Sequence, residues 1–598
     1  MKNAPVPQRL QRLREEMKAA GMDAYLVLSQ DFHASEYVGE HFKFREYLSG
    51  FTGSAGTLVI LPEKAALWTD GRYFLQAEEQ LQGTGIQLMR SGMPGVPRLE
   101  EFLLKEILKG GTLGVDGRTI SKKEADRIRA ILSEKQIQLE EKRDLAETVW
   151  DERPPLSSAA VWELGVEYAG QSREEKLALL RQRMKEADAQ LLVLTALDEI
   201  AWCLNLRGND VECTPVVLAY LLLGQEDALL CIDAEKIPTE LQKKLAACGI
   251  ELRLYGEVYT LLRETSARRI LLDGASANDR VFQSLDPAVM TEDMPSPVIA
   301  LKAVKNTVEQ ENIRKAHEKD GVALCRFICW LKDHVGKETV TECSAAAQLE
   351  HFRQEEKEYL GPSFAPIVAY GAHGAIVHYS ATEETDAVLR AEGFCLADTG
   401  GHYLHGTTDV TRTIALGPLT QEEKRVYTLV LKGNLRLGGV KFLQGCCGAN
   451  LDVLARGALW EHGMDYNHGT GHGVGYLLSV HEGPQSVQWH LGPGGKEPLR
   501  PGMVLSNEPG FYAKDQFGVR LENLLLVRRA EDTPDSRFLN FETMTLVPFE
   551  REAILTELLN SEELTLLNAY HARVLRIIGP QLAPKERAWL QWAAAPLE

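Results

Sequence analysis

Five side chains in the second half of the chain could together hold metal ions. They are four carboxylates and one imidazole: Asp398, Asp409, His472, Glu508 and Glu522. This hard, oxygen-rich set suits manganese, or cobalt and iron in vitro, better than a thiolate-type zinc site does. Burying so many carboxylates without a cation would be prohibitively unfavourable. The set therefore predicts a site for divalent metal ions.

Local sequence patterns indicate how these side chains are positioned. An apolar strand ends at Asp398, the turn at residues 399–401 is expected to reverse the chain, and a second strand returns through Asp409. Such a hairpin would bring the two aspartates together. Alternation over residues 519–523 places Arg520 and Glu522 on one face of a strand, so Arg520 can lie beside the site.

The other two candidates lie in turn-rich sequence. Four glycines in residues 469–475 let the backbone approach closely around His472, and Glu508 precedes a Pro-Gly turn. Each candidate also has an ordinary explanation, because a strand-end aspartate usually caps a turn and a glycine-flanked histidine is usually a loop residue. Spacing alone therefore does not prove that the five converge.

Length and charge limit the classes of protein to consider. A chain of 598 residues with 44% apolar residues is too long for one hydrophobic core, so several domains are expected. The net charge of −19 repels phosphate backbones and anionic lipid surfaces. Nucleic acid is therefore not expected as a partner.

The cysteines and apolar runs bear on localisation. Ten cysteines without a Cys-x-x-Cys pair are typical of a reduced, cytosolic chain. The polar N-terminus does not resemble a secretory signal, and the longest apolar run, residues 216–223, is too short to span a bilayer. A cytoplasmic protein with no membrane partner is expected.

The first half of the chain contains an internal repeat. Residues 13–18 (LREEMK), followed by AYLVL, recur as residues 180–185 (LRQRMK), followed by QLLVL. In each copy an amphipathic helix leads into a buried strand, which predicts two related α/β domains. The predicted boundaries are 1–155 and 156–310, with a catalytic domain at 311–598. From about residue 551 the tail reads as helical, with a capping box at Asn560 and Glu563 and an end at Gly579-Pro580.

Five ordered motifs resemble those of the pita-bread metallopeptidases. They are GAHGAIVHY, LADTGGHYLHGTTDVTRT, NHGTGHGVGYLLSVHEGP, SNEPGFY and GVRLENL, over about residues 310 to 550. The duplicated front half, with TDGRYF and ALDEIAWCLNLRG, is similar to the long, three-domain aminopeptidase P branch. The resemblance implies an α/β (α+β) fold of two creatinase-type domains followed by a pita-bread domain.

The resemblance also implies a role for each site residue. Asp398 would bind one metal, Asp409 and Glu522 would bridge both, and His472 with Glu508 would complete the other. Hydroxide between the metals, most readily Mn²⁺ but also Co²⁺, Fe²⁺ or Zn²⁺, would attack the carbonyl carbon before proline. Glu508 would relay the proton to the leaving nitrogen.

Three outer histidines and two arginines would contact the substrate. The histidines match family positions that donate hydrogen bonds to the peptide and to the developing oxyanion: His378, His468 and His481. Arg520 would lie beside the metals, and Arg72 resembles a family arginine that reaches peptide carbonyls. The implied partners are peptides with proline in the second position, and relatives of this architecture are commonly homodimers.

Two alternative functions remain open, and one position differs from the family pattern. A prolidase would cut only Xaa-Pro dipeptides, and a pita-bread scaffold that lacks ligands would only bind; chain length and the intact ligand set disfavour them. His405 occupies a position that is usually acidic in relatives, just before Gly406. We expect an effect on metal affinity or pH optimum there, through the charge around the site, rather than loss of metal.

Overall fold

The computed structural model describes residues 4–492, 494–534 and 536–598. The predicted start of the first domain, Met1, lies outside the described residues. The chain forms two compact units, each described here by itself. The first comprises residues up to Leu164 together with Gln171–Ile299, and the second comprises Gly165–Gly170 together with Ala300–Glu598. The predicted boundary at residue 155 thus falls inside the first unit.

The first unit contains a six-stranded sheet in its N-terminal half. Its order is β4-β3-β2-β1-β5-β6. The β1–β2 and β2–β3 pairs are antiparallel, and the remaining pairs are parallel. The strands are β1 (Ala24–Val27), β2 (Thr57–Ile60), β3 (Ala65–Thr69), β4 (Ile86–Arg90), β5 (Thr112–Gly114) and β6 (Gln138–Glu140).

A second six-stranded sheet follows in the same unit, and its topology repeats the first. Its order is β12-β11-β10-β8-β13-β14, with the same sequence of antiparallel and parallel pairs. A duplicated sequence would produce this identity of topology. The strands are β8 (Leu191–Leu194), β10 (Tyr220–Gly224), β11 (Ala228–Cys231), β12 (Ile250–Arg253), β13 (Arg269–Leu272) and β14 (Met290–Asp293).

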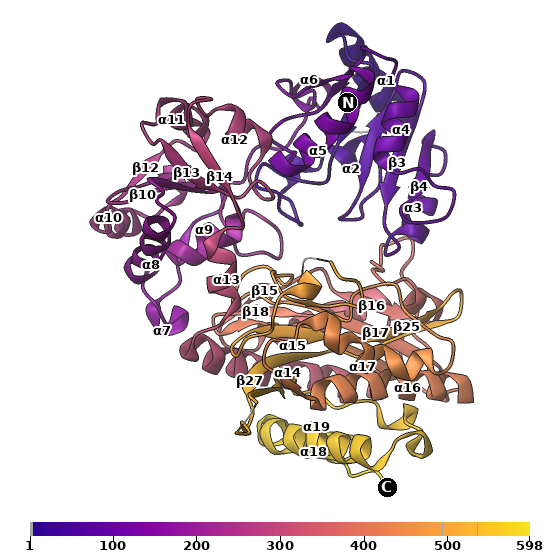
Figure 1. Ribbon diagram of the computed structural model, residues 1–598. Coiled ribbons are helices and arrows are strands. Elements are labelled where there is room, and N and C mark those ends of the chain that lie inside the picture. Colours follow the sequence, from indigo (N-terminus) through magenta and orange to yellow (C-terminus); the bar gives the residue numbers. More distant parts are fainter. Residues whose placement is uncertain (1–3, 493, 535) are drawn as a thin grey trace. The chain divides into compact units, whose positions relative to one another are not determined.

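Helices accompany both sheets (Figure 1). The repeated amphipathic segments form α1 and α8, each directly before the central strand of its sheet. The helices of this unit are α1 (Val6–Ala19), α2 (Phe44–Ser49), α3 (Phe74–Gln80), α4 (Leu99–Glu106), α5 (Lys122–Leu132), α6 (Ala146–Val149), α8 (Arg173–Glu186), α9 (Leu197–Leu204), α10 (Thr239–Ala247), α11 (Val258–Glu264) and α12 (Asp279–Gln283). Two short strands, β7 (Trp162–Glu163) and β9 (Leu206–Arg207), pair with each other.

The longer part of the second unit begins at Ala300, within α13 (Pro297–Ala303), and combines small antiparallel sheets with long helices (Figure 1). The sheets are β15-β18-β19, β16-β17-β20, β21-β28-β27-β24, β22-β23 and β25-β26. The helices are α14 (Thr307–His334), α15 (Glu342–Gln354), α16 (Gln421–Gly439), α17 (Gly448–Trp460), α18 (Ser561–Ile578) and α19 (Pro584–Ala593). The strands that carry or flank site residues are β17 (Phe394–Thr399), β20 (Val410–Ala415), β22 (Gly471–His472), β24 (Val504–Asn507), β25 (Gly510–Ala513), β26 (Phe517–Arg520) and β27 (Asn523–Arg529). The other strands of these sheets include β15 (Tyr359–Pro362), β16 (Ile367–Tyr370), β21 (Lys441–Leu443), β23 (Ser486–Val487) and β28 (Phe538–Thr543).

The predicted hairpin around the two aspartates forms, but its turn was wrongly placed. Residue 399 ends β17 and residue 401 begins β18 (Gly401–Tyr403), so the chain continues there. It reverses at Leu404–His405, before β19 (Gly406–Thr407). Gly400 lacks a Cβ for another reason, since a Cβ would lie 2.1 Å from the carbonyl oxygen of Thr408. Close approach, not a turn, requires this glycine.

The C-terminal helix α18 is capped as predicted. Asn560 and Glu563 form a capping box, and the helix ends at Ile578, directly before Gly579-Pro580. The two last helices, yellow in Figure 1, pack against α14 and α16, and α18 contributes Val574 and Ile578 to a core shared with α14. The extension is therefore part of the second unit.

A short segment from early in the sequence also belongs to the second unit. It contains α7 (Val166–Ala169), whose Tyr168 ring meets the His405 ring edge to face at 5.4 Å. The Asn306 side-chain amide donates to the Ala169 carbonyl at 2.8 Å. The chain thus contributes to this unit twice, at residues 165–170 and again from residue 300 onwards.

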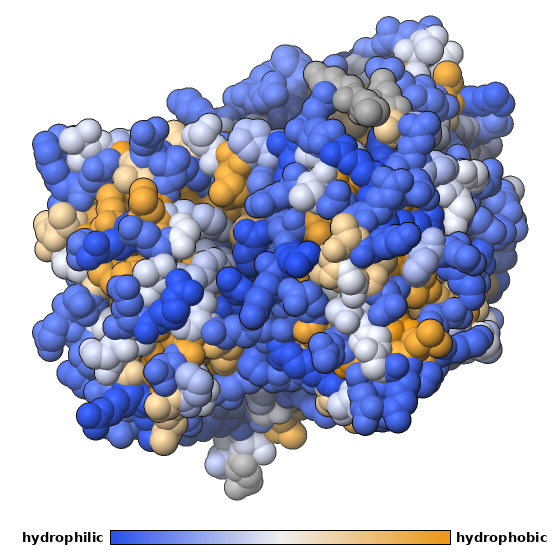
Figure 2. All heavy atoms as spheres, turned by 90° about the horizontal axis from the view of Figure 1, so that it is seen from above, coloured by the Kyte–Doolittle hydropathy of each residue, from blue (hydrophilic) through white to orange (hydrophobic). Residues whose placement is uncertain are grey.

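None of the helices in the described ranges is both long and apolar enough to cross a membrane. On the face shown in Figure 2, hydrophilic side chains predominate, and apolar side chains form small separate patches.

Candidate metal centre

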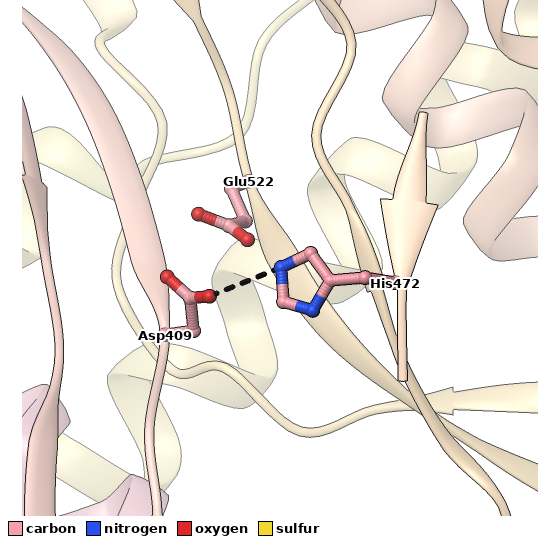
Figure 3. A group of neighbouring side chains, drawn as sticks. All are labelled: Asp409, His472 and Glu522. Atoms are coloured by element: carbon pink, nitrogen blue, oxygen red, sulfur yellow. Dashed lines mark ion pairs between the residues drawn. The ribbon is translucent and has the colours of Figure 1, made fainter. Parts of the chain in front are cut away.

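Three of the five predicted ligands form a tight cluster. Asp409, His472 and Glu522 each present one ligand atom, and these atoms all lie within 4.8 Å of one another. His472 Nε2 lies 3.4 Å from Asp409 Oδ2. Figure 3 shows the three side chains pointing toward one another from separate strands and loops. Two carboxylates and one imidazole are an established donor set for a divalent cation.

The other two predicted ligands border this cluster. Glu508, in the connection between β24 and β25, has Oε1 3.7 Å from His472 Nε2. Asp398 lies in β17 opposite Thr411 of β20, which places it beside the start of the strand that follows Asp409. Its Oδ2 accepts a hydrogen bond from Arg520 Nη2 at 2.6 Å.

Burial and mutual repulsion favour the protonated form of three of these carboxylates. Burial, followed by repulsion from Asp398 and Glu508, raises the pKa of Asp409 well above its ordinary value. The pKa of Glu508 is raised in the same way by burial and by Glu522. Burial and Asp409 raise the pKa of Glu522. Positive charge among these groups would replace the protons and relieve the repulsion.

The residues present fit a divalent metal. Asp398 Oδ1 and Glu522 Oε1 are buried oxygen atoms with no hydrogen-bond donor among the described residues. An ionised oxygen buried without a partner is costly, whereas a cation satisfies it directly. Carboxylate oxygens and one imidazole nitrogen are also the donors that Mn²⁺, Fe²⁺, Co²⁺ and Zn²⁺ accept. The chemistry of the donor set therefore agrees with the prediction of metal binding.

Close backbone packing positions the ligands. A Cβ at Gly471 would lie 2.0 Å from the Ser506 carbonyl oxygen, so glycine lets β22 approach β24. Ser506 Oγ accepts a hydrogen bond from the His472 amide at 2.9 Å. Thr411 Oγ1 donates to Glu522 Oε2 at 2.9 Å. The ligands are thus held from outside the cluster, as metal ligands need to be.

Arg520 and Glu522 meet at the site, as the alternating pattern predicts. Both side chains contact Thr411, because Arg520 Nε donates to its Oγ1 at 3.3 Å. The pattern did not show that Glu522 lies between strands, since β26 ends at Arg520 and β27 begins at Asn523. The buried Arg520 guanidinium also lies next to Asp398 and offsets part of the negative charge.

A hydrogen-bonded chain links the ligands to His468. Arg520 Nη1 donates to the Tyr512 hydroxyl at 2.7 Å, and this hydroxyl lies 2.8 Å from His468 Nε2. Tyr512 lies in the quoted motif SNEPGFY, but the sequence analysis gave it no role. Its role becomes visible only from the two hydrogen-bond partners of its hydroxyl, Arg520 and His468, which lie in other motifs of the sequence.

The other two outer histidines lie on loops of the same unit. The His481 ring meets the His472 ring edge to face, with centroids 4.4 Å apart. His378 follows the short helix η5 (Gly371–Ala375), and the carbonyl of the preceding Val377 accepts a hydrogen bond from Arg520 Nη2 at 3.3 Å. Both loops are thus joined to the ligand cluster or to the arginine beside it.

Glu342, which the sequence analysis missed, secures the loop that carries His378. This carboxylate is fully buried. It accepts hydrogen bonds from the Tyr370 amide at 2.7 Å, the Tyr379 hydroxyl at 2.8 Å and the Ala387 amide at 3.1 Å, and it pairs with His373 Nδ1 at 2.9 Å. These partners lie 28 to 45 residues away in sequence, so no local motif reveals the interaction.

Arg72 and His405 remain outside the cluster. Arg72 belongs to the first unit, where Asp70 accepts two hydrogen bonds from its guanidinium at 2.9 Å. Its contact with substrate stays a prediction. His405 Nδ1 lies 3.2 Å from Glu358 Oε2 and packs on Tyr168. The predicted effect of His405 on metal affinity also stays a prediction.

Comparisons with known proteins agree with this architecture. Residues 311–529 match "Metallopeptidase family M24", and residues 537–597 match the "C-terminal region of peptidase_M24". Two further matches to the "Creatinase/Prolidase N-terminal domain" cover residues 9–145 and 152–309.

Relatives that are 39% identical extend over almost the whole chain. A probable Xaa-Pro aminopeptidase P of Laccaria bicolor is 39% identical over 99% of this chain and 93% of its own length. Xaa-Pro aminopeptidase ApepP of Drosophila melanogaster is 39% identical over 99% of both chains.

A solved structure matches the fold from end to end. It is an X-prolyl aminopeptidase of Caenorhabditis elegans, described as a cytosolic enzyme with a di-nuclear active site. It is 34% identical, covers 100% of both chains and has a TM-score of 0.95. The predicted fold class, two creatinase-type α/β domains followed by a pita-bread domain, is confirmed. The chain therefore belongs to metallopeptidase family M24, in the branch that carries creatinase-type domains before the catalytic domain.

Proposed function

We propose that the protein is a metal-dependent Xaa-Pro aminopeptidase, which releases the N-terminal residue from peptides with proline in the second position. The observation that carries this proposal is the cluster of Asp409, His472 and Glu522 with Glu508 and Asp398 at its border. Full-length relatives named Xaa-Pro aminopeptidase support the choice of substrate.

All five residues are assigned as ligands of two divalent cations. Asp409 and Glu522, the most deeply buried of the five, would hold the ions together with Asp398. His472 and Glu508 would complete the ligand set. When bound, the cations supply a water molecule of lowered pKa as the nucleophile. Mn²⁺ is the proposed native metal, because oxygen donors dominate the set.

The chain's own groups would handle the proton and the substrate. Glu508 is placed to accept a proton from the nucleophile and pass it to the leaving prolyl nitrogen. His378, His468 and His481 would donate hydrogen bonds to the peptide and to the oxygen that becomes negative in the transition state. Arg520 would hold the Asp398 side chain in one orientation, since the two form a 2.6 Å ion pair.

The proposed selectivity follows from the scissile bond. An Xaa-Pro amide has no N–H, and the ring restricts the preceding residue. An enzyme that must recognise that N–H cannot use this bond, whereas a site shaped around the ring can. Arg72 is proposed to contact peptide carbonyls, because a guanidinium can donate to several acceptors at once.

Two further properties are proposed from the relatives and the sequence. A cytoplasmic location is supported by the cytosolic C. elegans relative and by the free cysteines, several of them buried. A homodimer is proposed from the resemblance of the catalytic domain to family members that are commonly dimers. Light scattering of the purified protein checks the second property.

The test compares three peptides after the metal has been stripped and manganese restored. Release of the N-terminal residue from Arg-Pro-Pro, but not from Arg-Ala-Pro, is the expected result, and chelator should abolish it. Asp409→Ala should lose this activity together with bound metal. Preference for the dipeptide Arg-Pro would instead identify a prolidase, and bound metal without any cleavage would leave a binding scaffold.

A further inference from the structure

The residue that follows His481 is a buried carboxylate between two buried lysines. Glu482 is 3% exposed, and Lys302 and Lys305 are 4% and 1% exposed. Glu482 Oε1 forms an ion pair with Lys305 Nζ, and Oε2 lies 3.0 Å from Lys302 Nζ. We call these three residues the Glu482 clamp. Each carboxylate oxygen has its own cation, so rotation of the Glu482 side chain would break one ion pair or both.

The lysines of the clamp lie where the chain enters the second unit. Lys302 belongs to the end of α13, and Lys305 follows it. The Lys305 amide donates to the Gly502 carbonyl at 2.9 Å, and its ammonium donates to the Lys302 carbonyl at 2.9 Å. Val304 also forms an isolated β-bridge with Met503. The cations are therefore fixed to the strand region before β24 and do not move freely.

The backbone of Glu482 is fixed to the residue after His472. Its amide donates to the Gly473 carbonyl at 2.8 Å, and a Cβ at Gly473 would lie 2.0 Å from the Glu482 carbonyl oxygen. Residues 472–473 and 481–482 thus pack without space between them. In this arrangement the His481 and His472 rings lie 4.4 Å apart at an interplanar angle of 80°.

We propose that the Glu482 clamp is a positioning device that holds the His481 ring against the ligand His472. The clamp itself touches neither substrate nor metal. Stability alone does not explain three buried charges, because proteins in which apolar residues replace a buried ion pair are often as stable as the original. A residue adjacent to a proposed oxyanion donor gives such a cluster a different use, since catalytic donors must be held in one orientation.

The inference rests on the proposed function for the role of His481, but the position of the ring can be tested without activity. In full-length, metal-free protein labelled with ¹³C at the histidine Cε1, Glu482→Gln should shift or broaden the His481 signal. A His481→Asn variant assigns that signal. If the signal stays unchanged in Glu482→Gln, the proposal is overturned.

Glu563 provides a matched control. It is also a buried carboxylate, 2% exposed, between two cations: Oε2 lies 3.0 Å from Lys432 Nζ and Oε1 lies 2.7 Å from Arg436 Nε. Glu563→Gln should leave the His481 signal in place while lowering thermal stability to a similar extent. An equal shift in both variants would mean a general loss of structure and would overturn the proposal.

Kinetics of the manganese-loaded protein on Arg-Pro-Pro provide a second test of the Glu482 clamp. Glu482→Gln should lower kcat about tenfold or more with little change in KM, because misplacement of a catalytic group mainly affects the transition state. In a His481→Ala background the same substitution should have no further effect. Additive losses would overturn the proposal.

Lys302→Met serves if Glu482→Gln does not fold, because it leaves a balanced Lys305–Glu482 pair. Compared with the unaltered protein, it should displace the His481 signal and lower kcat; an unchanged signal and kcat would overturn the proposal. Inactivity of the unaltered chain on Arg-Pro-Pro would refute the proposed function, whereas the histidine signal would still decide the positioning role.

Discussion

The carboxylates of the metal centre are buried close together, so ionising them is unfavourable when no cation is bound. The pKa of Asp409, of Glu508 and of Glu522 is raised by burial and by the neighbouring carboxylates. A divalent cation offsets this repulsion, because each of the oxygens that repel one another attracts the cation. Proton and metal are thus competitors for one set of atoms.

Removal of metal should make stability depend on pH in an unusual direction. The folded carboxylates have raised pKa values, so their contribution is fully present below the ordinary values near 4 and is lost as pH rises. Chelated protein should therefore melt at lower temperature at pH 8 than at pH 6, and the stabilisation by Mn²⁺ should grow over the same range. Differential scanning fluorimetry measures both.

Asp409→Asn is the matched variant for that measurement. It removes one of the repelling charges while keeping the shape of the side chain. The chelated variant should lose less stability between pH 6 and pH 8 than the chelated unaltered protein does. Equal slopes for the two proteins would show that the cluster does not titrate in this range.

The hydroxyl of Tyr512 should matter for turnover and not for metal content. Tyr512→Phe removes the link between Arg520 and His468 but leaves all five ligands. We expect kcat on Arg-Pro-Pro to fall about tenfold, the equivalent of one hydrogen bond of about 1.4 kcal/mol. Tyr427→Phe removes another buried hydroxyl, bound to the Glu550 amide, and should leave kcat unchanged. Loss of metal from Tyr512→Phe would contradict this account.

Which site residues the sequence reveals depends on how far away their partners lie. The ligands and outer histidines stand in short motifs, so resemblance identifies them one by one. The roles of Glu342 and Tyr512 are not predicted from the sequence, because their hydrogen-bond partners come close only in the folded chain. Arg520 and Glu522 lie between these cases: alternation predicts a shared face, and folding supplies Thr411 as their common contact.

Single elements of the second unit act as supports for the loops that carry histidines. Helix α15 begins with Glu342, which gathers four donors from the residues around His378. The hairpin of β17 and β20 has the same function for the aspartates. Its turn was predicted at the wrong glycine, because glycine permits close approach as well as chain reversal, and sequence does not distinguish the two uses.

Glu342→Gln should loosen the support under His378. An amide has only one acceptor oxygen, so at least one buried donor loses its partner, at a cost of about 2 to 3 kcal/mol. Urea unfolding should show this loss, and kcat should fall with it because His378 is no longer fixed. Glu338→Gln, with 57% of its side chain exposed, is the control and should change neither quantity. Unaltered stability of Glu342→Gln would refute the supporting role.

At the scale of the whole molecule, the sequence predicts the duplicated topology but not the joining of both sheets in one compact unit. The repeat of helix and strand motifs predicts two similar sheets, and the strand orders are identical. That both sheets share one compact unit depends on contacts such as the ion pair between Arg129 and Asp279, residues 150 positions apart. No local pattern encodes such a contact.

A buried histidine in the C-terminal extension should contribute to acid sensitivity. His571 accepts a hydrogen bond from the Phe549 amide at 3.1 Å, and burial, followed by Arg412, lowers its pKa to about 3. Its contribution to stability is present above the ordinary pKa of 6.5 and is lost as pH falls toward 3.

His571→Gln tests this contribution, because a glutamine oxygen can accept the same hydrogen bond without binding a proton. Between pH 6.5 and pH 5 the free energy of unfolding of the unaltered protein should fall more steeply than that of the variant, by up to about 1.4 kcal/mol per pH unit. Chelator in both samples removes the metal as a variable. Parallel slopes would mean that His571 takes up a proton in the folded protein as readily as in the unfolded chain.

The early segment that belongs to the second unit has a consequence for synthesis. Residues 165–170 leave the ribosome about 130 positions before residue 300, where the remainder of their unit begins. At 5 to 20 residues per second, helix α7 waits on the order of ten seconds before the first turn of α14 emerges to receive it. During that interval the segment is a nascent loop without its docking surface, and a chaperone that binds exposed apolar side chains such as Val166 has time to reach it.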